Sequence, residues 1–166
     1  MHSVYIGIGS NILPRLYWIV SGIDELLIRK IIINPVFSKA YVAAPWGKDA
    51  EGYSYINLVL RGSTRLDPGR LLNQLISVEL SMHRERYYKN APRTLDLDIL
   101  LYEDFIIDQP GLIIPHRLIK DRRFVLKPLI DLAPKLIHPV FKKSIDDLAK
   151  TCKDSCVVKP LCKGGF

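Results

Sequence analysis

The sequence predicts an α+β fold, because extended segments with alternating apolar residues are interleaved with two segments of helical periodicity. We expect strands at 4–9, 36–44 and 53–60, and a fourth within 91–101. One helix follows the first strand and another follows the third. This order is the ferredoxin-like arrangement, in which two helices pack on one face of an antiparallel sheet. The other face is then free to carry an active site under loops.

The first strand ends in Gly7-Ile8-Gly9, where missing side chains let the backbone approach a ligand or another strand closely. We expect Asn11 to cap the following helix and Pro14 to lie in its first turn. The helix should end near Lys30. Its apolar residues recur at helical spacing: Leu16, Ile19, Val20, Ile23, Leu26 and Leu27.

The third strand presents two different faces. Ile56, Leu58 and Leu60 form an apolar face that we expect in the core, while Tyr55 and Asn57 lie on the other. An aromatic ring beside an amide can stack on and hydrogen-bond a flat heterocycle. The same two residues are also compatible with an ordinary exposed sheet face, so both interpretations stay open at this point.

Asp67 and Pro68 are predicted as the N-cap and first residue of the second helix, with Glu79 beside its buried stripe. The stripe consists of Leu71, Leu72, Leu75, Val78 and Met82. Further on we expect a short strand at 105–107, a turn at 108–111, and helical turns over 121–132 that are interrupted or restarted at Pro128. A last helical turn is expected at 146–149.

Length and composition predict a single domain over residues 1–166, with a flexible tail from about residue 151. With 48% hydrophobic and 25% charged residues, the chain has the composition of a soluble globular protein rather than a disordered or fibrous one. The net charge of +7 favours anionic partners. Apolar runs are too short for a membrane span or a signal peptide. We therefore expect a cytoplasmic monomer without a membrane partner.

The three cysteines are Cys152, Cys156 and Cys162, all near the C-terminal end. No fourth ligand at suitable spacing accompanies them, so free thiols are favoured over a zinc site.

The stretch 91–101 contains Asp96 and Asp98 on one strand face, about 6.6–6.8 Å apart at the Cα level. Two carboxylates at this spacing suit magnesium, which also takes substrate phosphates as ligands. Arg84, Arg86 and Arg93 lie just upstream and can bind phosphate oxygens in a forked geometry. Each signal alone is more typical of a solvated strand edge or loop, but their combination within fifteen residues favours phosphate chemistry.

Other basic residues are less decisive. His116, Arg122 and Arg123 are candidates for phosphate binding, but each is also compatible with a surface or packing role. The sequence has no Gly-x-x-x-x-Gly-Lys-Ser/Thr loop, so an ATP site would have to be built in another way.

Four motifs together resemble the 6-hydroxymethyl-7,8-dihydropterin pyrophosphokinase family of folate biosynthesis. They are 5–11 (YIGIGSN), 92–100 (PRTLDLDIL), Pro115-His116, and 122–129 (RRFVLKPL). The resemblance runs from about residue 4 to 134. It implies transfer of the terminal diphosphoryl unit of ATP to the pterin hydroxymethyl oxygen, with release of AMP.

The resemblance also implies roles for individual residues. Two Mg²⁺ ions are expected on Asp96 and Asp98, with Arg84 and Arg93 as the catalytic cations over the phosphates. The residues expected at ATP are Glu79, Arg86, Lys89, Ile99, His116 and Arg122. The residues expected at the pterin are Gly9, Ala43, Ala44, Trp46, Tyr55, Asn57 and Phe124.

This chain departs from the common family pattern in two places. Ala43-Ala44 stands where many members carry Thr-Pro, which preserves a backbone contact but not a threonine hydroxyl contact. Lys89-Asn90-Ala91 replaces the common Arg-Trp-Gly, which removes a tryptophan that could stack as a lid.

Two alternatives remain on the residues alone. A palm-type nucleotidyl transferase or cyclase also places two acids on a ferredoxin-like sheet, and differs in using a nucleotide hydroxyl as acceptor. A basic RNA-binding module is the other, with binding that weakens steeply in salt. Acids on the open sheet face would repel RNA, so we expect no nucleic-acid partner.

Overall fold

The computed structural model describes residues 1–44, 53–84 and 91–161. Its centre is an antiparallel sheet with the order β5–β1–β4–β3–β8, and β2 pairs with another part of β4. The strands are β1 (His2–Ser10), β2 (Ile33–Phe37), β3 (Tyr41–Ala43), β4 (Tyr55–Thr64), β5 (Asp96–Tyr102) and β8 (Val158–Pro160). The central strands β5, β1 and β4 confirm the predicted α+β, ferredoxin-like arrangement.

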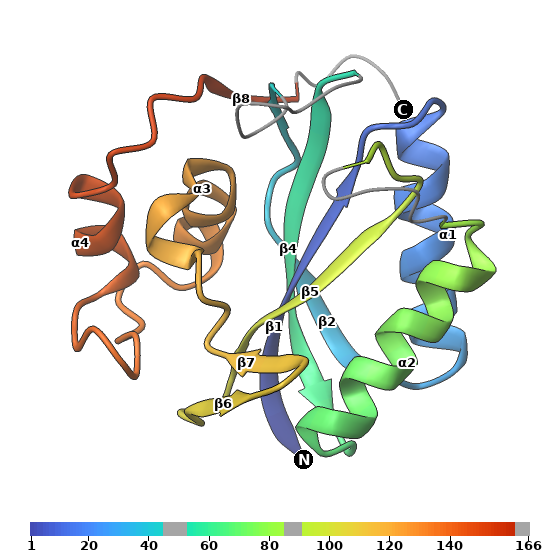
Figure 1. Cartoon of the computed structure of the whole chain (residues 1–166), viewed down its shortest axis with the longest axis horizontal. Helices are drawn as coiled ribbons and strands as arrows, with labels where there is room; N and C mark the ends of the chain where they lie inside the picture. The colour runs from blue at the N-terminus through green and yellow to red at the C-terminus, as the bar shows by residue number, and fades with distance from the viewer. Residues whose placement is uncertain (45–52, 85–90, 162–166) are drawn as a thin grey trace.

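Helices α1 (Arg15–Ile28) and α2 (Pro68–Ser81) cover one face of the sheet, as Figure 1 shows. Asp67 is the N-cap of α2, and its Oδ1 accepts the backbone N–H of Arg70 (2.9 Å), which confirms the predicted cap. The prediction for α1 was wrong, because its N-cap is Pro14. The Asn11 side chain instead accepts the backbone N–H of Arg93 (2.8 Å).

The opposite face is partly covered by two further helices, α3 (Arg123–Leu132) and α4 (Ile145–Lys150), which lie on the far side of the sheet from α1 in Figure 1. Their apolar residues form a second core with β1, β4 and β5. Both Leu100 and Leu101 of β5 join this core because a register shift opposite Tyr5 and Ile6 inserts an extra residue. The rest of this face stays open for the site.

Several strands and helices begin or end at residues other than those predicted from the sequence. The expected strand 36–44 is divided at Ser38, whose hydroxyl accepts the Val59 N–H (2.9 Å), so β2 and β3 pair separately with β4. The strand expected at 105–107 lies at β6 (Ile107–Gln109) and pairs with β7 (Leu112–Ile114). Helix α3 runs through Pro128 without restarting.

The segment that the sequence analysis expected to be flexible includes β8, which pairs with β3. Sequence patterning missed this strand because it is only three residues long and ends in proline. None of the helices in the described ranges combines the length and apolarity needed to cross a bilayer.

His138 organises the connection between α3 and α4. Its side chain is 2% exposed, and its Nδ1 accepts the backbone N–H groups of Val140 (3.2 Å) and Phe141 (3.4 Å). Burial lowers its pKa from 6.5 to about 4. Below pH 6.5 the unfolded chain therefore binds a proton at His138, whereas the folded chain does not bind one until about pH 4. The free energy of unfolding consequently decreases as the pH falls from 6.5 to 4.

Between pH 7.5 and 5, the wild-type protein should lose about 2 kcal/mol more unfolding free energy than the His138→Gln variant. Urea denaturation of both proteins at both pH values measures this difference. An equal loss in the two proteins would show that His138 has the same pKa in the folded and unfolded chains.

Candidate active site

The candidate site is built on the central strand β1, at the face opposite α1 and α2. Gly9 pairs with Asn57 of β4 on one side and with Asp96 of β5 on the other, and Gly7 pairs with Asp98. Directly opposed residues in an antiparallel sheet place their side chains on the same face. The predicted amide and the two predicted carboxylates therefore share one surface, separated by glycines.

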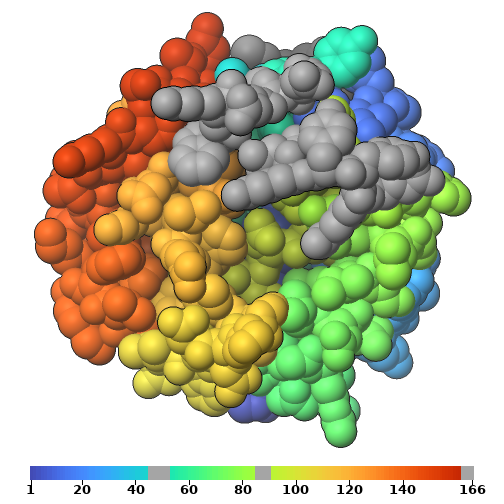
Figure 2. All heavy atoms as spheres, in the orientation of Figure 1, coloured from blue at the N-terminus to red at the C-terminus, as the bar shows by residue number. Residues whose placement is uncertain are grey.

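A cavity of about 390 Å³ lies over this surface, within the usual size range of small-molecule sites. Figure 2 shows the hollow between the orange surface of α3 and the green surface of α2, with yellow-green atoms of the β5 region at its floor. The predicted site residues that line it are Gly9, Ala44, Tyr55, Asn57, Glu79, Arg84, Arg93, Asp96, Asp98, His116, Arg122 and Phe124.

Two predicted site residues do not line the cavity. Ile99 is buried in the core under α1 and α2, because its side chain points to the face opposite its neighbour Asp98. Ala43 is buried in a small cluster with Tyr41 and Val158. Trp46, Arg86 and Lys89 lie outside the described residues, as does the Lys89-Asn90 departure from the family pattern.

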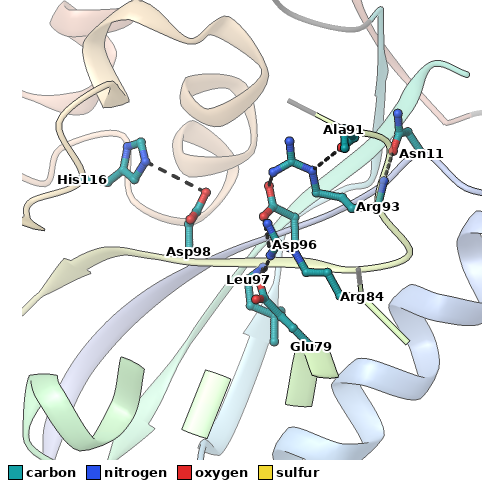
Figure 3. A network of polar contacts seen from close by, with 9 residues as sticks. All are labelled: Asn11, Glu79, Arg84, Ala91, Arg93, Asp96, Leu97, Asp98 and His116. Atoms are coloured by element: carbon teal, nitrogen blue, oxygen red, sulfur yellow. Dashed lines mark hydrogen bonds and ion pairs between the residues drawn. The ribbon is translucent and has the colours of Figure 1, made fainter. Parts of the chain in front are cut away.

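Asp96 is held between two arginines. Its Oδ1 lies 2.8 Å from an Arg84 guanidinium nitrogen, and its Oδ2 accepts a hydrogen bond from Arg93 (3.1 Å). Figure 3 shows both guanidinium groups turned toward this carboxylate. Arg93 is placed by Asn11, which accepts its backbone N–H and donates its own N–H to the Arg93 carbonyl (3.2 Å).

Glu79 lies beneath this arrangement at the end of α2, with 3% of its surface exposed. Its Oε1 accepts the backbone N–H of Leu97 (2.7 Å) and also contacts the Arg84 guanidinium. Leu97 separates the two aspartates. One buried carboxylate therefore anchors both the strand that carries the aspartates and an arginine beside them (Figure 3).

Asp98 has an unusual environment for a carboxylate. It faces the cavity and keeps 40% of its side-chain surface accessible, but protein walls surround it on the remaining sides. This partial desolvation, followed by repulsion from Asp96, raises its pKa from 3.8 to about 7. A cation between two such carboxylates would relieve both effects. The oxygen donors of Asp96 and Asp98 thus fit magnesium chemically.

His116 faces Asp98 from the segment after β7, with Nε2 4.0 Å from Asp98 Oδ2 (Figure 3). Burial, followed by the charge of Arg122, lowers the pKa of His116 to about 4, so the ring is neutral at pH 7. Its Nδ1 accepts the Leu118 N–H (3.2 Å), which places the ring proton on Nε2. His116 therefore offers a neutral N–H donor to the cavity beside Asp98.

The other end of the cavity is aromatic. The Arg93 guanidinium lies 6.0 Å from the Tyr55 ring centre, and that of Arg122 lies 5.6 Å from the Phe124 ring centre. Asn57 is 8% exposed, and its Nδ2 has no hydrogen-bond partner among the described residues. A buried amide N–H without an acceptor costs free energy, so this group is suited to an acceptor atom of a bound ligand.

Sequence analysis missed several residues of the site. Asn11 was assigned to a helix cap, although its place directly after Gly9-Ser10 could have indicated a role at the end of β1. Leu72 and Ile76 of α2 line the cavity, whereas the sequence pattern assigned Leu72 to the buried stripe of the helix and gave no role to Ile76. Gly111 and Val125 also line it, and nothing in the local sequence pattern distinguishes them.

Gly9→Ala should raise the Michaelis or dissociation constant of any ligand held by Asn57 about tenfold, since about one hydrogen bond is lost. An added Cβ would lie 3.0 Å from Asn57 Oδ1 and would displace the amide. Gly69→Ala is the matched control, because its Cβ meets only Asp67 Oδ1, at 3.5 Å. Equal ligand affinity in the two variants would show that Gly9 does not serve the site.

Known proteins resemble the chain in both sequence and fold. The family model for 7,8-dihydro-6-hydroxymethylpterin-pyrophosphokinase (HPPK) matches residues 5–134. The 2-amino-4-hydroxy-6-hydroxymethyldihydropteridine pyrophosphokinase of Aquifex aeolicus is 34% identical over 98% of this chain and 97% of its own length. The protein of the same name from Pseudomonas aeruginosa is 39% identical, over 82% of this chain and 83% of its own.

Solved structures show the same fold. A Plasmodium falciparum HPPK-DHPS crystal structure has a TM-score of 0.72 at 16% identity, and the match covers 90% of this chain. This chain spans 44% of that longer protein. The family match over residues 5–134 and the near full-length similarity to the Aquifex enzyme lead to one assignment. The chain belongs to the HPPK family of pyrophosphokinases.

Proposed function

We propose that the chain transfers the terminal diphosphoryl unit of ATP to the hydroxymethyl oxygen of 6-hydroxymethyl-7,8-dihydropterin, with magnesium, and releases AMP. One observation carries the proposal beyond the family assignment. Asn57, Gly9 and Asp96 are consecutive cross-strand neighbours, so an unsatisfied amide and the carboxylate pair face one cavity. A heterocycle at the amide would hold its substituent near the carboxylates.

On the pterin side, the ring would lie between Tyr55 and Phe124. Asn57 would read its edge, because its free Nδ2 donates and its Oδ1 accepts. The aromatic rings bury the flat faces and the amide fixes the orientation. This positioning would hold the hydroxymethyl oxygen in line with the phosphorus it attacks, which is the main requirement of phosphoryl-type transfer.

On the phosphate side, magnesium bound to Asp96 and Asp98 would supply charge neutralisation and orientation of the phosphates. Arg84 and Arg93 would move from Asp96 toward phosphate oxygens as the aspartates bind cations. Both arginines are close enough to serve either partner, since each already contacts Asp96. Their fixed charge would stabilise the charge that develops on the bridging and terminal oxygens.

His116 and Arg122 extend the donor set at the cavity wall. The neutral Nε2–H of His116 donates to an anion without the need for a protonated ring, so phosphate binding at this residue does not require low pH. The apolar side chains of Leu72 and Ile76 provide a surface for the flat purine on the α2 side. We also propose that Glu79 contributes indirectly, by holding the Arg84 guanidinium in position from beneath the site.

The nucleotidyl transferase alternative uses similar acids but a different acceptor and a different phosphorus. The family match and the unsatisfied amide of Asn57 favour a heterocyclic acceptor with a hydroxymethyl group. A basic RNA-binding module has no comparable support, because the open sheet face carries Asp96 and Asp98.

Isothermal titration provides a direct test of this site. An ATP analogue with a methylene group between the α- and β-phosphorus should bind in the presence of magnesium and much more weakly with EDTA. The hydroxymethyl pterin should then bind to the analogue-loaded protein. Absence of pterin binding to the magnesium-loaded complex would contradict the proposal.

A further inference from the structure

The C-terminal segment 153–161 lies outside the region that the family model matches, yet it contacts two walls of the cavity. Its strand β8 extends the sheet edge at β3, where Val158 pairs with Ala43. The Leu161 N–H then donates to the Ala40 carbonyl (2.8 Å). These contacts attach the segment to the strand that leads into Ala44, a residue of the cavity wall.

Asp154 connects the same segment to α3. Its Oδ2 accepts the backbone N–H of Arg123 (2.9 Å), and its Oδ1 accepts the N–H of Cys156 (2.9 Å). Arg122, the N-cap residue of α3, makes no side-chain capping hydrogen bond. Asp154 therefore acts as the capping side chain of α3 from a distant part of the chain, and its negative charge suits the helix N-terminus.

The start of α3 is the part of this helix that forms the site. Arg122 and Phe124 both line the cavity, and they flank the residue whose N–H Asp154 accepts. Val158 is 6% exposed and belongs to the apolar cluster of Tyr41 and Ala43, against which Phe124 packs. The C-terminal segment thus links the Ala44 wall of the cavity to its Phe124 wall.

We propose that Asp154 is a positioning residue for substrate binding, which fixes the first turn of α3 and with it Arg122 and Phe124. This inference rests on the function proposed above for the same cavity. Asp154 touches neither substrate nor reacting atoms in this assignment. Its loss would let the first turn of α3 sample other orientations, so that binding requires reordering of both side chains. The cost would appear in substrate affinity more than in turnover at saturation.

The test compares full-length Asp154→Ala and Asp154→Asn with the wild type, and uses Asp108→Ala as the charge-matched control. The Asp108 side chain is 78% exposed, and its carboxylate lies 3.7 Å from an Arg117 guanidinium nitrogen. Loss of a helix cap typically shifts an equilibrium by about 2- to 30-fold. We expect the KM for pterin and ATP to rise about 5- to 10-fold in Asp154→Ala, with kcat within about twofold.

Asp154→Asn keeps one acceptor oxygen and should recover part of the affinity, whereas Asp108→Ala should match the wild type. Unchanged KM values in a folded Asp154→Ala protein would overturn the proposal, as would a loss confined to kcat. If Asp154→Ala fails to fold, the comparison uses Asp154→Asn instead, whose KM should be about two- to fivefold higher than that of the wild type. A wild-type-like KM in Asp154→Asn would then overturn the proposal.

Amide hydrogen exchange separates this inference from the proposed function. Exchange of the backbone amides at 123–126 should be faster in Asp154→Ala than in Asp108→Ala, whether or not the protein turns over pterin. An inactive wild-type protein would refute the proposed function, but the exchange comparison would still test the capping role of Asp154. Equal exchange in the two variants would refute the capping role itself.

Discussion

Asp98→Asn should lower kcat for AMP release from ATP and hydroxymethyl pterin about 1,000-fold, and Asp96→Asn should do the same. Each change removes a charged oxygen ligand while it preserves the shape of the side chain, so a loss reports on the carboxylate itself. A coupled assay for AMP at saturating magnesium measures the effect. Asp108→Asn, which neutralises an exposed carboxylate, should retain full activity.

The two variants should differ in stability when magnesium is absent. The pKa of Asp98 is about 7 in the folded chain, so the folded state binds more protons than the unfolded state between pH 3.8 and 7. Stability is therefore lost as the pH rises through this window, and above pH 7 the ionised group opposes folding. At pH 8, Asp98→Asn should melt at a higher temperature than the wild type. Asp96→Asn should not, because it weakens the pairs with Arg84 and Arg93.

Full activity of Asp96→Asn or Asp98→Asn in the AMP assay would refute the assignment of these two carboxylates as the metal site.

Glu79→Ala should destabilise the protein by about 3 kcal/mol and reduce activity as well. The change leaves the Leu97 N–H without its acceptor and removes the Glu79 carboxylate from the buried Arg84 guanidinium, which still contacts Asp96. Both effects act on the strand between the two aspartates. Urea denaturation measures the first effect and the AMP assay the second. Arg84 is 8% exposed at its side chain, so solvent cannot replace the lost partner efficiently.

A matched control is available on α1. Glu25 also pairs with an arginine, Arg29, but these side chains are 30% and 34% exposed, so removal of Glu25 should cost less than about 1 kcal/mol. Glu79→Gln should fall between the wild type and Glu79→Ala, because its carbonyl can still accept the Leu97 N–H. Equal destabilisation by Glu79→Ala and Glu25→Ala would show that the buried carboxylate is not a structural anchor.

The sequence predicted those parts of the fold that depend on local pattern. The alternation around Asp96 and Asp98 indicated the strand and its polar face, and Asp67-Pro68 indicated the start of α2. Features that depend on distant partners were not predictable in this way. The strand β8 exists because β3 offers an edge, and its three residues carry no periodic signal of their own. Asn11 has a suitable residue type for a helix cap, but its oxygen is occupied by the backbone of Arg93.

The same distinction between local pattern and distant partners applies to the site. Tyr55, Asn57, Asp96 and Asp98 were placed on one face because strand alternation and sheet order are enough to do so. The resemblance to a known family added residues that come from separate segments, such as Ala44 and Phe124. Neither source indicated that Glu79 would anchor Leu97, since that contact requires the packing of α2 against β5.

The phosphorus that is attacked tests the central claim most directly. Purified protein with magnesium, ATP and the hydroxymethyl dihydropterin should be followed by ³¹P NMR and mass spectrometry. Attack at the β-phosphorus predicts AMP and pterin diphosphate in equal amounts, with no reaction when the pterin is omitted. Formation of inorganic diphosphate together with a nucleotidylated acceptor would contradict the account and indicate attack at the α-phosphorus.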